Sequence, residues 1–256
     1  MRGRTTVGLA AAVVLALVPA GGAEARPDRA MERLPLAGRV VVVDPGHQLG
    51  NHNFPRKTNR MVPAGGFHKP CNTTGTATDG GYPEATFAWR VARRLQQRLV
   101  GLGAKVVLTR TSNRQDRWGP CVDTRGRAGN RVDADLKLSI HGDGTYAAGA
   151  HGFHVIAPTD RRRWTHDIFR PSRELARTVR KALRQGHFTA ANYTAGGDGL
   201  DFRSDLGTLN LSDVPTVMVE LGNMRDRRDA GRMTSAAGQE AYAAALTRAL
   251  LRYLTW

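Results

Sequence analysis

Continuous apolar runs alternate along the chain with segments of helical spacing. A strand that is covered on both faces of a sheet gives an unbroken run of β-branched and aliphatic residues. Such runs predict strands at 39–43, 104–109, 136–140, 152–157 and 214–219. Amphipathic segments predict helices at 83–101, 172–184 and 239–254.

The first of these helices shows its pattern most plainly. Ala85, Ala88, Ala92, Leu95 and Leu99 recur at three- and four-residue steps, which places them on one face of a helix. Strands lie before and after it, so the segment forms a strand–helix–strand unit. Because this alternation is typical of parallel sheets, the sequence predicts an α/β fold: a single domain with a mostly parallel sheet and helices on both faces.

The N-terminus has the pattern of an export signal. Arg2 and Arg4 precede an apolar run at 9–20, and Ala23 and Ala25 supply the small residues of a signal-peptidase site. The run is shorter than the ~20 apolar residues that a membrane anchor needs. We therefore expect an exported protein, secreted or held in the periplasm or cell wall, with no transmembrane anchor once the signal is removed. The expected segments are a signal peptide at 1–25, a lead-in at 26–37 and one folded domain at 38–256.

The composition is that of a folded protein with a basic surface. Apolar residues make up 41% and charged residues 23% of the chain, which argues against disorder. The formal net charge is +16, and it becomes +15 when the signal peptide with Arg2, Arg4 and Glu24 is removed. This charge fits an anionic partner, although a solvated arginine-rich surface explains it equally well. Because the protein is exported, we expect an anionic cell-wall polymer and no nucleic acid.

The chain contains two cysteines, Cys71 and Cys121. In an exported protein an even pair most simply forms one disulfide bond. A role as metal ligands is the weaker alternative, because the two cysteines lack a CxxC spacing and only His68 lies near them in sequence.

Titratable side chains follow three of the predicted strands. His47, His141 and Glu220 each come within about four residues of a strand end. In open α/β sheets the functional crevice lies outside the carboxyl ends of the strands, so these side chains are expected to converge there. Glu84 can join them, since the helix that it begins must start near one end of the sheet.

Two histidines and a carboxylate form a set of ligands suited to Zn²⁺, with a fourth position open for water. A second carboxylate can then act as the general base, while the ion lowers the pKa of the bound water to about 7. The ligands are separated by 36 and 56 residues, and such spacing is not specific by itself.

The same residues resemble the zinc-dependent N-acetylmuramoyl-L-alanine amidases, in the single-domain form of actinobacteria. The similarity covers about residues 38–254. It is carried, in order, by Val-Val-Val-Asp44-Pro45-Gly46-His47, the helix-opening Glu84, the stretch Arg125 to Asn130 leading to Ala134-Asp135-Leu136 and Ser139-Ile140-His141, and Pro215 to Gly222.

The resemblance implies a fold, an activity and a site. The fold is a sheet of about six strands, and the domain at 38–256 is the catalytic one. The substrate is peptidoglycan or a muropeptide fragment, cut at the amide between the lactyl group of N-acetylmuramic acid and L-alanine. His47, Glu84 and His141 would hold Zn²⁺ and Glu220 would be the catalytic residue; we expect the enzyme to be a monomer.

Two other functions remain open from the sequence. A zinc carboxypeptidase-like peptidase uses the same ligands and the same kind of base but cuts a different bond. A non-catalytic basic cell-wall-binding protein would explain the charge, although it has no need of a carboxylate beside an open metal position.

Other polar residues are given structural roles. Asp44 and Asp143 are predicted to form turns, and Arg125 to form a structural ion pair. The long loop at 48–82 is expected to form a wall or lid over the site. The remaining histidines are not expected to be metal ligands: His52, His68, His151, His154, His166 and His187.

Overall fold

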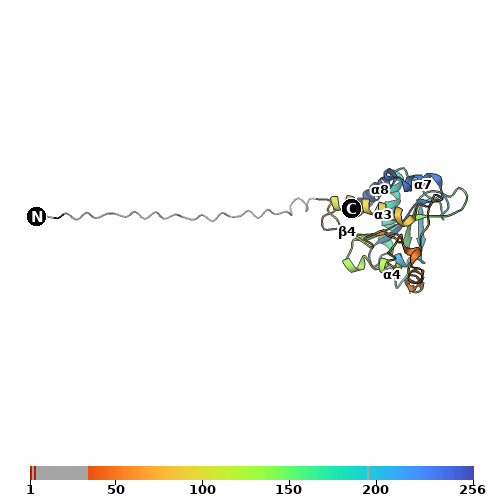
Figure 1. Cartoon of the computed structure of the whole chain (residues 1–256), viewed down its shortest axis with the longest axis horizontal. Coiled ribbons are helices and arrows are strands. Elements are labelled where there is room, and N and C mark those ends of the chain that lie inside the picture. The colour runs from red at the N-terminus through yellow and green to blue at the C-terminus, as the bar shows by residue number, and fades with distance from the viewer. Residues whose placement is uncertain (2, 4–33, 195) are drawn as a thin grey trace.

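A six-stranded sheet forms the centre of the molecule (Figure 1). The computed structural model describes residues 1, 3, 34–194 and 196–256, so the predicted signal peptide and residues 26–33 of the lead-in lie outside the described residues, apart from Met1 and Gly3. The strands of the sheet are β1 (Val40–Pro45), β4 (Lys105–Leu108), β5 (Leu136–Asp143), β6 (His154–Pro158), β7 (Leu200–Arg203) and β8 (Thr216–Asn223).

The strand order is β4-β1-β5-β8-β6-β7. Neighbouring strands are parallel except β6 and β8, which are antiparallel. This arrangement confirms the predicted α/β class and the mostly parallel sheet. The short strand β7 was not predicted, because its four residues show no alternation distinct from the surrounding loop.

The long helices cover one face of the sheet. They are α3 (Glu84–Gly101), α5 (Phe169–Gln185) and α8 (Ala236–Leu254). Val155 and Val219 point toward this face and belong to the main core. Their neighbours Ile156 and Met218 point the opposite way and pack on Leu209. The opposite face is covered by short helices, α4 (Val122–Gly126) and α6 (Gly207–Asn210), and Figure 1 shows α3 and α8 on one side and α4 on the other.

Several strands continue beyond their predicted ends. β1 includes Asp44 and Pro45, which are paired with Ser139 and Ile140 of β5. Pro45 can lie in the strand because a proline lacks only its own N–H donor. The inter-strand hydrogen bonds continue at Gly46, whose N–H donates to Ile140 O at 2.9 Å. The turn predicted at Asp44 is therefore wrong, because the strand continues through that residue.

The predicted loop at 48–82 contains short elements of its own. They are η1 (Asn51–Asn53), α2 (Pro55–Thr58) and the antiparallel pair β2 (Met61–Pro63) and β3 (His68–Pro70). The other short elements are η2 (Asn130–Val132) and α7 (Arg227–Thr234). None of the helices in the described part of the chain has both the length and the apolarity needed to cross a bilayer.

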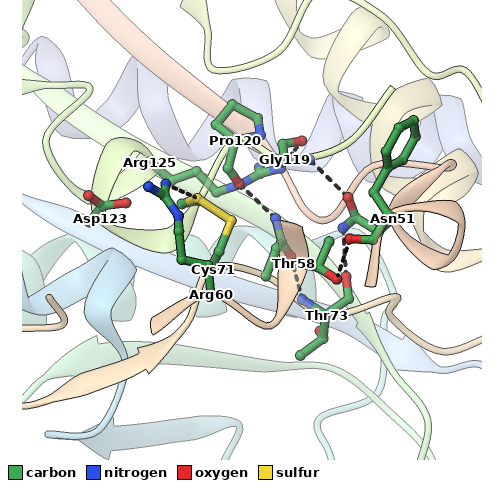
Figure 2. The surroundings of a disulfide bond; sticks show 12 residues. Asn51, Thr58, Arg60, Cys71, Thr73, Gly119, Pro120, Asp123 and Arg125 are labelled. Carbon is green, nitrogen blue, oxygen red and sulfur yellow. Dashed lines mark hydrogen bonds between the residues drawn. A yellow bond between two sulfur atoms is a disulfide. The ribbon is translucent and has the colours of Figure 1, made fainter. Parts of the chain in front are cut away.

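The Cys71–Cys121 disulfide is formed, as predicted (Figure 2). The two cysteines are 50 residues apart, and closing a loop of that size stabilises a fold by about 4 kcal/mol in the chain-entropy treatment. The bond joins the 48–82 loop to the segment that precedes α4. Asn51 adds to this connection, since it accepts from Gly119 N at 2.9 Å and donates to Thr73 O at 2.7 Å.

Candidate metal centre

His47, Glu84 and His141 meet at the carboxyl edge of the sheet. His47 follows β1, Glu84 begins α3, and His141 lies in β5. One ligand atom from each lies within 4.8 Å of the others. Glu84 Oε1 is 3.1 Å from His47 Nε2 and 2.9 Å from His141 Nδ1. The structure thus brings together the three residues that the sequence predicts as ligands.

The donor set fits a small divalent cation. Zinc held at about 2.1 Å by nitrogen and oxygen ligands has ~3.3 Å between neighbouring ligand atoms, close to the two separations measured from Glu84 Oε1. The three side chains are 12%, 5% and 13% exposed, so a bound ion would be shielded from water on most sides. Two imidazoles and one carboxylate also match the ligand types that zinc prefers.

The loop wall orients His47. Its Nδ1 lies 3.0 Å from the carbonyl oxygen of Thr73, which can only accept a hydrogen bond. Nδ1 therefore carries a proton, and Nε2 faces Glu84 and His141. A carbonyl that fixes the ring of a histidine in this way is the usual partner of a metal-binding imidazole. The 48–82 loop thus forms a wall of the site.

Two backbone N–H groups also bind the carboxylate of Glu84. Thr76 N donates to Oε2 at 2.9 Å and Gly142 N donates to Oε1 at 3.3 Å. Burial acts to raise the pKa of Glu84, but His47 and His141 outweigh it and bring the pKa well below its usual value. The carboxyl is therefore a carboxylate, the form that binds a metal ion.

Glu220 lies beside this cluster and outside it. In β8 it is paired with His141 of β5, and it lines the same cavity, which has a volume of about 340 Å³. Burial, Glu84 and Asp143 together raise its pKa well above the usual value, while Arg203 opposes them. A carboxyl with a raised pKa can both accept and return a proton near neutral pH.

Two buried arginines support the chain around His47. Arg125 forms the predicted ion pair, with its Nη1 2.6 Å from Asp44 Oδ1, and also donates to His47 O at 2.6 Å. Arg110, which sequence reasoning did not single out, donates to Gly46 O at 3.2 Å and Ala85 O at 2.7 Å. It therefore links the turn that carries His47 to the first turn of α3, which carries Glu84.

Asp44 and Asp143 differ in role. Asp44 is fully buried and accepts hydrogen bonds from Ser139 Oγ and Thr109 Oγ1, so it belongs to the support of the site. The turn predicted at Asp143 is also wrong, because Asp143 is the last residue of β5 and is paired with Asn223 of β8. Its Oδ1 accepts from Gly144 N at 2.7 Å, and the residue lines the cavity. The backbone contacts of Thr73 and Thr76 were also missed, because no side-chain pattern in the loop marks them.

The fold and the site together define a class of protein. A mostly parallel sheet whose carboxyl edge carries a His–Glu–His cluster that could hold a metal ion, next to a further glutamate, is typical of metal-dependent hydrolases. Comparison with known families is more specific. Residues 41–252 match the family Amidase_3, N-acetylmuramoyl-L-alanine amidase, and the chain belongs to this family.

Individual relatives agree with this membership. The chain is 40% identical over 222 residues to the N-acetylmuramoyl-L-alanine amidase Rv3717 of Mycobacterium tuberculosis, covering 86% of this chain and 88% of the relative. It is similar to the solved structure of the N-acetylmuramyl-L-alanine amidase Ami1 of Mycobacterium abscessus, with 42% identity and a TM-score of 0.78. The match covers 86% of this chain and 100% of the Ami1 chain. Ami1 of Mycobacterium smegmatis is 36% identical to this chain, with a TM-score of 0.79. That match covers 86% of this chain and 98% of the Ami1 chain. These findings confirm the resemblance and the hydrolase class.

Proposed function

We propose that this protein hydrolyses the amide between the lactyl group of N-acetylmuramic acid and L-alanine in peptidoglycan or its fragments. The observation that carries the proposal is the meeting of His47, Glu84 and His141 in one cavity with Glu220 beside them. Membership of the amidase family supports the choice of bond.

The proposed cofactor is Zn²⁺, held by His47 Nε2, Glu84 Oε1 and His141 Nδ1. A zinc ion bound there would supply a Lewis acid and make water a stronger acid. The protein supplies the fixed ligand geometry, through Thr73 O on His47 and Thr76 N on Glu84.

Glu220 is proposed to move the proton. Its carboxylate accepts a proton from water as the water oxygen adds to the carbonyl carbon. It then donates that proton to the alanine nitrogen as the C–N bond breaks, which leaves a lactyl carboxylic acid and a free amine. The acid then loses its own proton to the amine or to solvent. The raised pKa of Glu220, caused mainly by burial, suits both steps because the two protonation states are then closer in free energy near neutral pH.

The alternatives are less well supported. A carboxypeptidase-like peptidase fits the cluster, but the family match favours the amidase. A purely wall-binding protein explains the net charge, yet it leaves unexplained why a partly buried carboxyl with a raised pKa stands beside a cluster that could bind a metal ion.

The proposed setting is outside the cytoplasm. The signal-like N-terminus supports export, and a cell-wall amidase acts there. We further propose that the enzyme works as a monomer and that its basic surface binds an anionic cell-wall polymer, in keeping with the net charge of +15 that remains after removal of the signal peptide.

The test compares wild type with Glu220→Gln on muramyl dipeptide. We expect the wild-type enzyme to release N-acetylmuramic acid and the intact dipeptide, identified by mass spectrometry. Glu220→Gln should keep its metal content but lose turnover by about 10²–10⁴-fold, because it lacks the general base.

Glu174→Gln is the matched control, since Glu174 is an exposed glutamate of α5 on the opposite face of the sheet. It should keep full activity. Near-normal turnover by Glu220→Gln would refute the role of Glu220, and products in which the sugar remains attached to L-alanine would refute the bond assignment.

A further inference from the structure

His154 lies on the opposite side of Glu220 from the metal cluster. In the sheet, β8 stands between β5 and β6, and Glu220 is paired with His141 on one side and His154 on the other. Directly opposed residues of adjacent strands point to the same face of the sheet, with Cβ atoms about 4.5–5.5 Å apart in an antiparallel pair. His154 is therefore the direct cross-strand neighbour of Glu220.

Both side chains have buried polar atoms without a partner. Glu220 Oε2 and His154 Nδ1 are inaccessible to water, and neither makes a hydrogen bond within the described part of the chain. His154 as a whole is 4% exposed. A buried polar atom without a partner costs about 1–3 kcal/mol, so two such atoms on facing residues call for an explanation.

The protonation state of His154 and the packing of its ring both allow it to donate a hydrogen bond. Burial lowers the pKa of His154, although Asp143 and Asp201 act in the opposite direction, so the imidazole is neutral and carries one N–H. The imidazole forms a T-shaped pair with the ring of Tyr193, with ring centroids 5.8 Å apart and an interplanar angle of 88°. This contact restricts the rotation of the imidazole.

We propose that His154 is a positioning residue for Glu220: its imidazole N–H donates to the Glu220 carboxylate when substrate is bound and fixes the direction in which the carboxylate meets the attacking water. Hydrogen bonds of this kind are often not closed in a substrate-free enzyme and tighten in the complex. The inference rests on the proposed role of Glu220 as the base, and it adds a residue that the metal cluster and the family motifs leave aside.

The experiment separates a donor role from a packing role. His154→Phe fills the space and keeps the contact with Tyr193 but has no N–H. His154→Asn and His154→Gln place an N–H near the positions of Nδ1 and Nε2. We expect His154→Phe to lower kcat about 10–100-fold, with KM within about threefold of wild type and unchanged metal content. At least one of the two amide variants should recover kcat to within about threefold of wild type.

Two further variants complete the test. His166→Ala is the control, since His166 is an exposed histidine that pairs with Asp160, and it should behave as wild type. The second is His154→Phe combined with Glu220→Gln, which should be no slower than Glu220→Gln alone, because residues that act through one group are not additive.

The proposal is overturned if His154→Phe keeps wild-type kcat, if it loses metal, or if all three substitutions lower kcat equally. It is also overturned if the effects of the two single variants multiply in the double variant. The proposed role of Glu220 is tested separately, by Glu220→Gln alone. If that role is wrong, Glu220→Gln remains active whichever residue occupies position 154.

Discussion

His47 has a backbone conformation that few non-glycine residues adopt. Its φ is +53°, in the left-handed region, which is unfavourable for a residue with a Cβ. Two hydrogen bonds maintain this conformation. Arg125 donates to the backbone carbonyl of His47, and the His47 ring donates from Nδ1 to Thr73 O. Backbone strain of this kind persists where the surroundings impose it, and it is concentrated at functional sites.

Two glycines allow the chain to approach the cluster closely. A Cβ on Gly46 would lie 2.4 Å from His141 Cε1. A Cβ on Gly75 would lie 2.7 Å from Glu84 Oε2 and 2.9 Å from His47 Cδ2. The absence of a side chain at these positions therefore leaves room for the ligands.

Gly75→Ala is expected to disturb the metal site. Gly81→Ala is the matched control, because Gly75 and Gly81 have φ of +78° and +80° but a Cβ on Gly81 would meet nothing within 4 Å. Both substitutions should cost about 1–2 kcal/mol of backbone strain. Only Gly75→Ala should also lower zinc affinity and activity by about 10–100-fold, measured by chelator competition and turnover. Equal metal affinity in the two variants would show that the close approach is not needed.

At the scale of elements, the ends of strands and helices are joined by buried polar contacts. Lys137 of β5 is fully buried, and its ammonium donates to Arg125 O, Gly126 O and Thr208 O. These carbonyls belong to α4 and α6, so one lysine attaches both short helices to the sheet. Burial lowers the pKa of Lys137 to about 8.

The buried pair of Asp44 and Arg125 should make stability depend on acid pH. Burial acts to raise the pKa of Asp44, but Arg125 and the hydroxyls of Ser139 and Thr109 hold it well below its usual value. The unfolded chain therefore binds a proton here more readily than the folded one. The stabilisation is complete above about pH 3.9 and is lost as the pH falls through the window below it.

We expect the unfolding free energy of wild type to fall more between pH 5 and pH 2 than that of Asp44→Asn, by on the order of 2 kcal/mol. Urea denaturation across this range, with chelator present in every sample, measures the difference. Asp205→Asn is the control, since Asp205 also pairs with arginine but lies at the surface. Parallel pH profiles for wild type and Asp44→Asn would contradict the assignment.

At the scale of the whole molecule, the two faces of the sheet are specialised. The face under the long helices is apolar and forms the main core. The other face carries the metal cluster, Glu220 and His154. The outer surface of α5 and α8, which lies away from the cavity, exposes basic side chains, including Arg177, Lys181, Arg184, Arg248 and Arg252.

The proposed binding to an anionic wall polymer should depend on salt. Between about 0.01 M and 1 M ionic strength the screening length shrinks from about 30 Å to about 3 Å. Retention of the protein on purified sacculi should therefore fall steeply over this range in a sedimentation assay. Sacculi stripped of anionic polymer serve as the control: they still offer the proposed substrate, but the amount of protein that they retain should change much less with salt. Retention that is unchanged by salt would show that the net charge is not what holds the protein there.

Much of this structure was accessible from the sequence. The alternation of apolar runs and amphipathic segments gave the α/β class and located the three long helices within a few residues, because helical and strand periodicity are local properties. The convergence of His47, Glu84, His141 and Glu220 could be expected because parallel strands end at one edge of a sheet. With two cysteines in the chain, a single disulfide pairing was possible.

Other features were decided only by the tertiary structure. A charged residue such as Asp44 can lie inside a strand because Arg125, 81 residues away, supplies its counter-charge. Thr73 and Thr76 act through backbone atoms, which every residue possesses and no sequence pattern marks. His154 faces Glu220 because β6 runs antiparallel to β8 in one particular register. Strand direction and register depend on contacts between distant segments, and so they become fixed only when the whole chain is folded.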